Sequence, residues 1–495
     1  MTILVTVLVY FGLLLLISRL SGIGNNDAFF RGNRTSPWPV VSFGMLGASL
    51  SGVTFISVPG MVMIGDMTYL QMCLGFIIGY VVISFVLLPI YYKHGLTSIY
   101  SYVGSRLGAA AQKSSSFFFL LSKLTGASAR LYLVCHILKV YAFSSQFSIM
   151  GSHIDVPFII VVLLTLCLIW CYTHSSGIKT LVWTDFLQTL CLLVSSIVLF
   201  LYCGRSLGLG LFESFSSVLS DSHSRIFEFS DWGSKQHFVK QFLSGVFITI
   251  VMTGLDQDMM QKNLTCKDLR SSQKDMCSYG LMFLPLNFLF LSIGVLILQL
   301  YSSMGISFPL KGDSLLPDLV SSGMLGDSVL VVFTIGIISS AFSSADSALT
   351  SLTTSFCIDI LDIESAGSRF HSRQESTRKL VHVLMSVLFV VFILLFEIVD
   401  SPSVLDAIYT IAGYTYGPLL GLFAFCMFTR RTPRSRYIPF VAVVCPILCY
   451  LIDSLTYHYT GYKFGYEMLM FNGLLTYVGL YILPKSEENF YKNKI

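Results

Sequence analysis

The sequence is poor in charged residues. Asp, Glu, Lys and Arg make up 12% of its 495 residues, about half the share of a typical soluble domain. Hydrophobic residues make up 54%, and the mean hydropathy is +0.74. The net charge of +4 is spread along the chain rather than gathered in a patch, which argues against nucleic acid as a partner. This composition predicts a polytopic membrane protein.

The chain also lacks the marks of a cleaved leader and of a Cys-rich metal site. The first apolar run, residues 2–20, has neither a basic n-region nor a small-residue cleavage site, so we expect a retained span. Cys167 and Cys171, like Cys445 and Cys449, are four residues apart on predicted helices. We interpret both pairs as small core residues rather than metal ligands.

Long apolar runs, in contrast, are abundant. Many approach the ~20 residues that cross a bilayer as a helix. They fall at 2–20, 37–63, 67–92, 114–143, 155–173, 178–204, 237–260, 276–302, 327–361, 378–399, 404–429, 436–455 and 466–484. The sequence therefore predicts an all-α integral membrane protein with about 13 transmembrane helices.

The basic residues predict how these spans are oriented. One set of alternate loops holds 22 Lys and Arg residues and the opposite set holds 6, while Lys123, Arg130 and Lys139 lie inside a span. Loops rich in Lys and Arg stay in the cytoplasm. We therefore expect a multi-pass protein of the cell (inner) membrane, with the N-terminus outside and the C-terminus cytoplasmic. Lys262 belongs to the cytoplasmic set in this count.

Two predicted spans are interrupted by small residues. The second reads FGMLGASLSGVTFISVPG (43–60) and the seventh reads FLSGVFITIVMTGLDQDMMQ (242–261). Close packing of helices through small residues explains either segment alone equally well. The two segments lie five spans apart, however, as expected when two five-helix halves are inverted repeats that each begin with a broken helix.

The ninth span carries a polar stripe within SSAFSSADSALTS (339–351). The serines that share one helical face are Ser340, Ser343, Ser344, Ser347 and Ser351. Serines can bond the carbonyl one turn back, so a structural stripe is one reading. Asp346 cannot be satisfied in that way, and a carboxylate at this depth pairs, binds a proton or meets a cation. Oxygen ligands of these types suit an alkali cation.

A basic pair lies inside the fourth span. Lys123 and Arg130 are seven residues apart, so they share a helical face. Cations this deep in a membrane need an acid nearby. That acid is either a substrate carboxylate, held in a bidentate manner by Arg130, or an internal one such as Asp346 or Asp256.

Six segments resemble the sodium:solute symporter family and occur in the family's order. They are GASLSGVTFISVPG in the second span, GLTSIYSYVGSRLG after the third, GIKTLVWTDFLQ (177–188), DQDMMQKNL (256–264), AFSSADSALTSLTTSFCIDI (341–360) and AGYTYGPLLGLF (412–423). The resemblance implies a leucine-transporter-type fold with a 5+5 inverted repeat. It also implies sodium-coupled uptake of a small organic solute by alternating access. The ten-helix core would span 37–430, between a first helix and loop at 1–36 and two helices and a short cytoplasmic tail at 431–495.

The resemblance also implies a sodium site. In the family, two backbone carbonyls come from the point where the first core helix unwinds, and these match Gly47 and Leu50. The eighth core helix supplies one carbonyl, matching Ser340, and two hydroxyls, matching Ser343 and Ser344. Sodium ions are accordingly the expected cofactor, used as the coupling ion.

Some relatives bind a second sodium ion on the fifth and eighth core helices. The matching residues here are Asp185, Ser343, Asp346 and Ser347. Asp346 departs from the family pattern, in which this position is more often Ser. The additional carboxylate would strengthen the site, exchange sodium for a proton or pair with a basic side chain. The alternative interpretation of Asp185 is a carboxylate at a helix end that takes part in a local hydrogen-bond network.

The resemblance implies a substrate site beside the first break. Ser51 and Thr54 match substrate-facing positions in the sialic-acid branch, and Gln71 projects from the third span. The predicted substrate-binding residues are Ser51, Thr54, Gln71, Lys123, Arg130 and Asp256. They suggest a carboxylated solute such as a sialic-acid-like sugar acid, with a neutral sugar as the alternative.

Other classes of protein fit less well. GASLSG resembles an intramembrane serine nucleophile motif, but no His is placed to act as its base, so we expect no enzyme. A transporter-fold sensor would need an output domain, for which the chain ends too soon after its last span. Broken helices at an occluded midplane site favour a carrier over a channel. Within the lipid bilayer a monomer is expected to suffice for transport.

Overall fold

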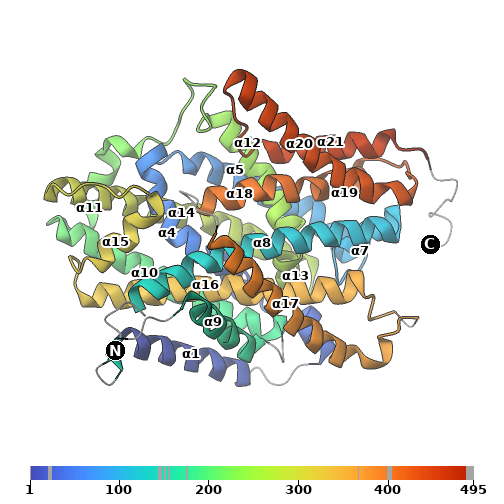
Figure 1. The fold of residues 1–495 in the computed structure, drawn as a ribbon, viewed down its shortest axis with the longest axis horizontal. Helices are drawn as coiled ribbons and strands as arrows, with labels where there is room; N and C mark the ends of the chain where they lie inside the picture. The colour runs from blue at the N-terminus through green and yellow to red at the C-terminus, as the bar shows by residue number, and fades with distance from the viewer. Residues whose placement is uncertain are drawn as a thin grey trace.

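The computed structural model describes residues 2–20, 25–142, 148–149, 152–153, 157–173, 177–365, 367–398 and 404–485. Strands β1 (Ser148–Ile149) and β2 (Ser152–His153) pair in an antiparallel manner, and the other elements of the described chain are helices. The long helices follow the longest axis of the molecule, as Figure 1 shows for α1, α8, α10 and α16. The predicted all-α architecture is therefore confirmed for these residues.

Several of the predicted spans are broken or bent, so the apolar runs form the following helices. They are α1 (Thr2–Leu20), α3 (Trp38–Ser49), α4 (Gly52–Gly65), α5 (Tyr69–Val82), α6 (Leu88–Lys93), α8 (Ala109–Ala142), α9 (Phe158–Thr173), α10 (Ile178–Ser206), α12 (Phe238–Thr249), α13 (Gln257–Asn263), α14 (Leu269–Met304), α16 (Asp327–Ser355), α17 (Gln374–Phe396), α18 (Val404–Thr415), α19 (Gly417–Phe428), α20 (Ile438–Thr460) and α21 (Met468–Ile482). Shorter helices between them are α2 (Asn26–Arg31), α7 (Tyr100–Leu107), α11 (Leu211–Ser220) and α15 (Leu315–Ser321).

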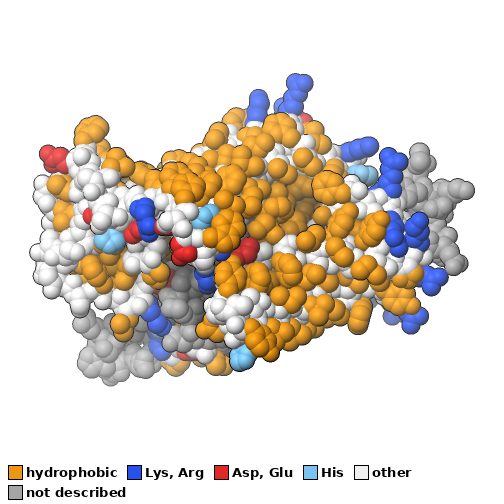
Figure 2. All heavy atoms as spheres, turned by 90° about the horizontal axis from the view of Figure 1, so that it is seen from above, with side chains coloured by type: hydrophobic (Ala, Val, Ile, Leu, Met, Phe, Trp, Pro, Cys, Tyr) orange, Lys and Arg blue, Asp and Glu red, His pale blue; other side chains and the backbone are white. Residues whose placement is uncertain are grey.

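Seven helices of the described chain are long and apolar enough to cross a membrane, or up to ten if each of three bent pairs is one span. The predicted spans 2–20, 155–173 and 466–484 correspond to α1, α9 and α21, whose described apolar parts are shorter. The count of 13 therefore stays a prediction. In Figure 2 hydrophobic side chains cover the middle of the visible face, and Lys and Arg side chains gather at its right-hand end.

Both predicted breaks are present. The helix α3 ends at Ser49, Leu50 leaves helical geometry (φ −80°, ψ 70°), and α4 continues at an angle of 59°. In the seventh span, the helical segment Phe238–Gly254 meets α13 at 68°. A third bend of 43° separates α18 from α19 and lies outside the prediction. The Gly417-Pro418 pair that follows this bend is the sequence signal for it.

The two cysteine pairs have different environments. Cys445 and Cys449 on α20 are buried, as predicted, whereas Cys167 and Cys171 lie on the exposed face of α9. The interpretation of Cys167 and Cys171 as core residues is therefore wrong. A helix that is apolar on all sides gives no signal of which face turns inward.

The helices α5 and α12 cross through glycines. A Cβ atom on Gly75 would lie 2.2 Å from the backbone oxygen of Phe242, and one on Gly245 would lie 2.3 Å from that of Met72. Neither position has room for a side chain. Small residues of this kind let helix backbones approach closely in a membrane.

Gly75→Ala is expected to push α5 away from α12 and to lower the melting temperature of the purified protein. Overpacking of a close-packed contact costs ~1–3 kcal/mol. The matched control is Gly12→Ala on α1, where nothing lies within 4 Å of an added Cβ. Equal melting temperatures for the two variants would contradict the close contact.

Candidate functional site

The first break packs directly against α10. A Cβ atom on Gly44 would lie 3.0 Å from the Cβ of Asp185, and one on Gly47 would lie 2.0 Å from Oγ1 of Thr189. The absence of side chains at these two positions brings the end of α3 against the turn of α10 that carries Asp185.

The serines of α16 face the same break. Ser344 Oγ donates a hydrogen bond to the backbone carbonyl of Ala48 at 3.1 Å. Ser340 Oγ would lie 3.4 Å from a Cβ on Gly52, at the start of α4. The last carbonyls of a helix lack intrahelical donors. Carbonyl and hydroxyl oxygens therefore meet between α3 and α16, as an alkali cation requires.

Ser343 also contacts α10. Its hydroxyl donates to Oδ1 of Asp185 at 2.7 Å. The other oxygen, Oδ2, lies 2.7 Å from the ammonium nitrogen of Lys262 on α13. The exposed fractions are 0% for Asp185 and 1% for Lys262, so this is a fully buried ion pair. The prediction that Lys262 belongs to a cytoplasmic loop is therefore wrong.

Asp346 lies next to this ion pair. Its Oδ2 accepts a hydrogen bond from the hydroxyl of Tyr172 on α9 at 2.8 Å. Its carboxyl group lies close enough to Asp185 and Lys262 to interact with them electrostatically. Ser347, one residue on, is also buried, and its hydroxyl has no hydrogen-bond partner among the described residues. The structure thus brings Asp185, Ser343 and Asp346, three of the four residues predicted for a second sodium ion, close to a lysine.

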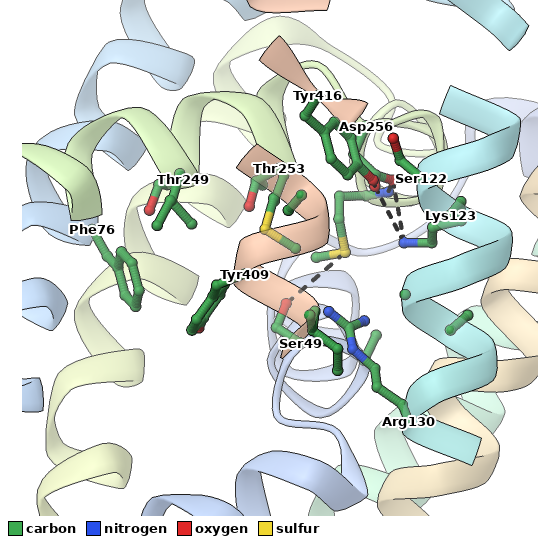
Figure 3. Close-up of a pocket in the computed structure, with 18 of the residues that line it drawn as sticks. Ser49, Phe76, Ser122, Lys123, Arg130, Thr249, Thr253, Asp256, Tyr409 and Tyr416 are labelled. Atoms are coloured by element: carbon green, nitrogen blue, oxygen red, sulfur yellow. Dashed lines mark hydrogen bonds and ion pairs between the residues drawn. The ribbon is translucent and has the colours of Figure 1, made fainter. Parts of the chain in front are cut away.

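A cavity of about 90 Å³ lies beside both breaks (Figure 3). It is lined by side chains from α3, α5, α8, the seventh span, α14 and α18. Hydroxyls from Ser49, Ser122, Thr249 and Thr253 line it together with aromatic rings from Phe76, Tyr80, Tyr279, Phe283 and Tyr409. Sites of this type, apolar with a few placed polar groups, are typical of small-molecule pockets.

Lys123 is neutralised within the protein. Its ammonium lies 2.7 Å from Oδ2 of Asp258 and 3.3 Å from Oδ2 of Asp256. Asp256 also accepts from the Tyr416 hydroxyl at 2.6 Å, and its side chain caps α13. Of the partners predicted for Lys123, the structure therefore has Asp256. Asp258, which also lies in the motif DQDMMQKNL, is a second partner that was not predicted.

Arg130 differs from Lys123, although both lie on α8 and line the cavity. Figure 3 shows the guanidinium of Arg130 reaching into the cavity, while Lys123 points toward Asp256. Within the described part of the chain, Arg130 has neither an ion-pair nor a hydrogen-bond partner. The cavity therefore offers a planar, unneutralised cation.

Three predicted substrate residues lie outside the lining of this cavity. Ser51 precedes the first residue of α4 and Thr54 lies in its first turn, and both are buried. Gln71 donates to the backbone carbonyl of Gln236 at 2.8 Å and accepts from the backbone N–H of Glu228 at 3.1 Å. Its amide therefore holds the segment before α12. Lys123, Arg130 and Asp256 are the predicted substrate residues that do line the cavity.

The family profile described as Sodium:solute symporter family matches residues 29–435. The chain belongs to this family. It is 25% identical to the sodium/sialic acid symporter NanT of Aliivibrio fischeri, over 86% of this chain and 82% of that protein. It is 22% identical to the sodium/sialic acid symporter SiaT of Proteus mirabilis, over 86% and 83%.

Among solved structures, this sodium:solute symporter resembles the substrate-bound outward-open state of a Na⁺-coupled sialic acid symporter. The TM-score is 0.80 at 18% identity, and the match covers 99% of both chains. At this identity the likeness shows the fold. The family resemblance predicted from the six motifs is confirmed, and the chain is a sodium-coupled membrane transporter rather than an enzyme.

Proposed function

We propose that this transporter couples inward sodium movement to uptake of a carboxylated solute, of the sugar-acid type that the sialic acid symporters carry. Arg130 is the observation that carries the substrate class. A guanidinium within a membrane span is costly unless an anion meets it, and the described part of the chain places no acid in contact with Arg130. A carboxylate matches its planar fork in a bidentate manner.

The rest of the cavity suits a hydroxylated ring. The hydroxyls of Ser49 and Thr253 can exchange hydrogen bonds with a polyol, and the rings of Phe76 and Tyr409 offer apolar faces. A neutral sugar would use these groups as well but would leave Arg130 without a counter-charge. This contrast favours the acid over the neutral sugar.

Sodium binds, in this proposal, between the first break and α16, with carbonyls of Gly47, Leu50 and Ser340 and hydroxyls of Ser343 and Ser344. An ion there would join α3 and α16, which the hydrogen bond from Ser344 to the carbonyl of Ala48 already links. Because the substrate cavity borders the same break, sodium and solute should each raise the affinity for the other, typically by 1–3 kcal/mol.

The architecture completes the proposal. We infer thirteen spans, with a 5+5 inverted repeat at 37–430 between flanking parts at 1–36 and 431–495. We also infer that the N-terminus lies outside the inner membrane and that the monomer is the transporting unit in the bilayer. The two broken helices support the repeat, and the gathering of Lys and Arg at one end of the molecule supports the orientation. The predicted cytoplasmic tail beyond residue 485 lies outside the described residues.

Uptake by the purified protein in proteoliposomes tests the proposal. Labelled sialic acid should accumulate when sodium is higher outside than inside, and should not accumulate when potassium replaces sodium. A neutral hexose should neither accumulate nor compete. Accumulation without sodium would contradict the coupling, and preference for the hexose would contradict the substrate class.

Ser344→Ala should lower the apparent affinity for sodium at least tenfold, because no other side chain replaces the lost oxygen ligand. Tenfold corresponds to about 1.4 kcal/mol. The measurement is the sodium concentration for half-maximal uptake. Ser351→Ala is the control on the same helix, since that hydroxyl bonds the carbonyl of Ala348 instead. Equal sodium dependence in both variants would rule out Ser344 as a ligand.

A further inference from the structure

The buried ion pair between Lys262 and Asp185 contains a cation that the chain itself supplies. The pair joins α13, which follows the second break, to α10, which supports the first. Ser343 on α16 donates to the other oxygen of the same carboxylate. Three helices therefore meet at the Asp185 carboxylate, and Lys262 supplies the cation that neutralises it.

The position of the ammonium conflicts with a second sodium ion. The four residues that match a second site are Asp185, Ser343, Asp346 and Ser347. Of these, Asp185 is the residue that α10 supplies. The ammonium nitrogen of Lys262 already lies 2.7 Å from its Oδ2 atom. Two cations held at the same carboxylate repel each other strongly in a buried site. A sodium ion would thus have to displace the ammonium before it could bind Asp185.

Lysine is suited to this substitution. Its ammonium is a compact point charge with three donors on a flexible stem, and Lys262 has an exposed fraction of 1%. The carboxylate oxygen of Asp185 that it contacts is a hard ligand of the kind that holds an alkali ion.

We propose that the ammonium of Lys262 takes the place of the second sodium ion, so that this transporter binds one sodium ion per cycle. This inference rests on the proposed sodium site at Ser344. The tethered cation links the second broken helix to the helices beside the first, and it does so without an ion from solution.

The stoichiometry can be measured without knowing the substrate. The melting temperature of the purified full-length protein is recorded against sodium chloride, with choline chloride keeping the ionic strength constant. Once sodium is well above its dissociation constant, stability rises with the logarithm of its concentration in proportion to the number of ions bound. The parent protein should show the slope of one ion.

Lys262→Met removes the charge and keeps the length of the side chain, so it should open the second site. Its slope against the logarithm of sodium concentration should be about twice that of the parent. Lys262→Arg, which keeps a cation, should retain the slope of one ion. Lys262→Met combined with Asp185→Asn removes both charges and should also retain the slope of one ion.

Two results would overturn the inference: a two-ion slope in the parent, or a folded Lys262→Met variant with the slope of one ion. A Lys262→Met variant that folds only in high sodium upholds it, because the ion then restores what the ammonium provided. If that variant folds at no sodium concentration, the parent slope decides alone. Absence of any sodium effect in the parent would instead defeat the proposed sodium site itself.

Discussion

Replacing Arg130 with glutamine is expected to lower the affinity for a carboxylated substrate at least 100-fold. The change removes the unpaired cation of the cavity and with it a bidentate, charge-assisted contact. Loss of one partner from a buried charge pair costs about 2–5 kcal/mol, and 100-fold corresponds to about 2.7 kcal/mol. Competition binding or uptake at saturating sodium gives the affinity.

Two variants on the same helix make this result specific. Arg130→Lys keeps the charge but loses the planar fork, so its affinity should lie between those of the parent and Arg130→Gln. Lys139→Gln removes a cation from α8 outside the cavity lining and should bind like the parent. Sodium-dependent melting should be unchanged in all three. Unaltered substrate affinity in Arg130→Gln would exclude Arg130 from the substrate site.

Lys123→Met should be strongly destabilising, with a loss of about 3–5 kcal/mol in the free energy of unfolding. It leaves Asp256 and Asp258, both almost fully buried, without their shared counter-charge. Like charges held close together in a low-dielectric interior repel strongly. The readout is the melting temperature of the purified protein in detergent.

The second variant needed here is Lys123→Met together with Asp256→Asn. Asparagine still caps a helix N-terminus as well as aspartate does and can still accept from Tyr416. With one carboxylate removed, part of the lost stability should return. If the single variant melts like the parent, Lys123 contributes little to the cluster, and its place as a counter-charge is refuted.

The broken helices were predictable because glycines act locally. Gly47 and Gly52 flank the first break, and Gly254 ends the helical segment before the second. The family order of the motifs added the partner helix, since it linked the serines of 339–351 to the first break. The contact from Ser344 to Ala48 agrees with that expectation.

The positions of Lys262 and Gln71 were not predictable in the same way. A count of Lys and Arg between apolar runs treats every such residue as solvated, and it has no means of detecting a half-helix that folds back at 68° into the protein. Gln71 lies on a span that is apolar on most sides, so its rotation about the helix axis has no periodic signal. Both depend on tertiary packing.

The ion pair between Lys262 and Asp185 also bears on energy conversion. A cation fixed to the chain returns with the empty carrier, so it adds nothing to the charge moved per cycle. One sodium ion carried with one monoanionic solute is an electroneutral cycle. The ~2.3 kcal/mol per 100 mV that a second sodium ion would contribute is then not used. A tenfold sodium gradient alone, about 1.4 kcal/mol, limits accumulation to about tenfold, and uptake persists when the membrane potential collapses.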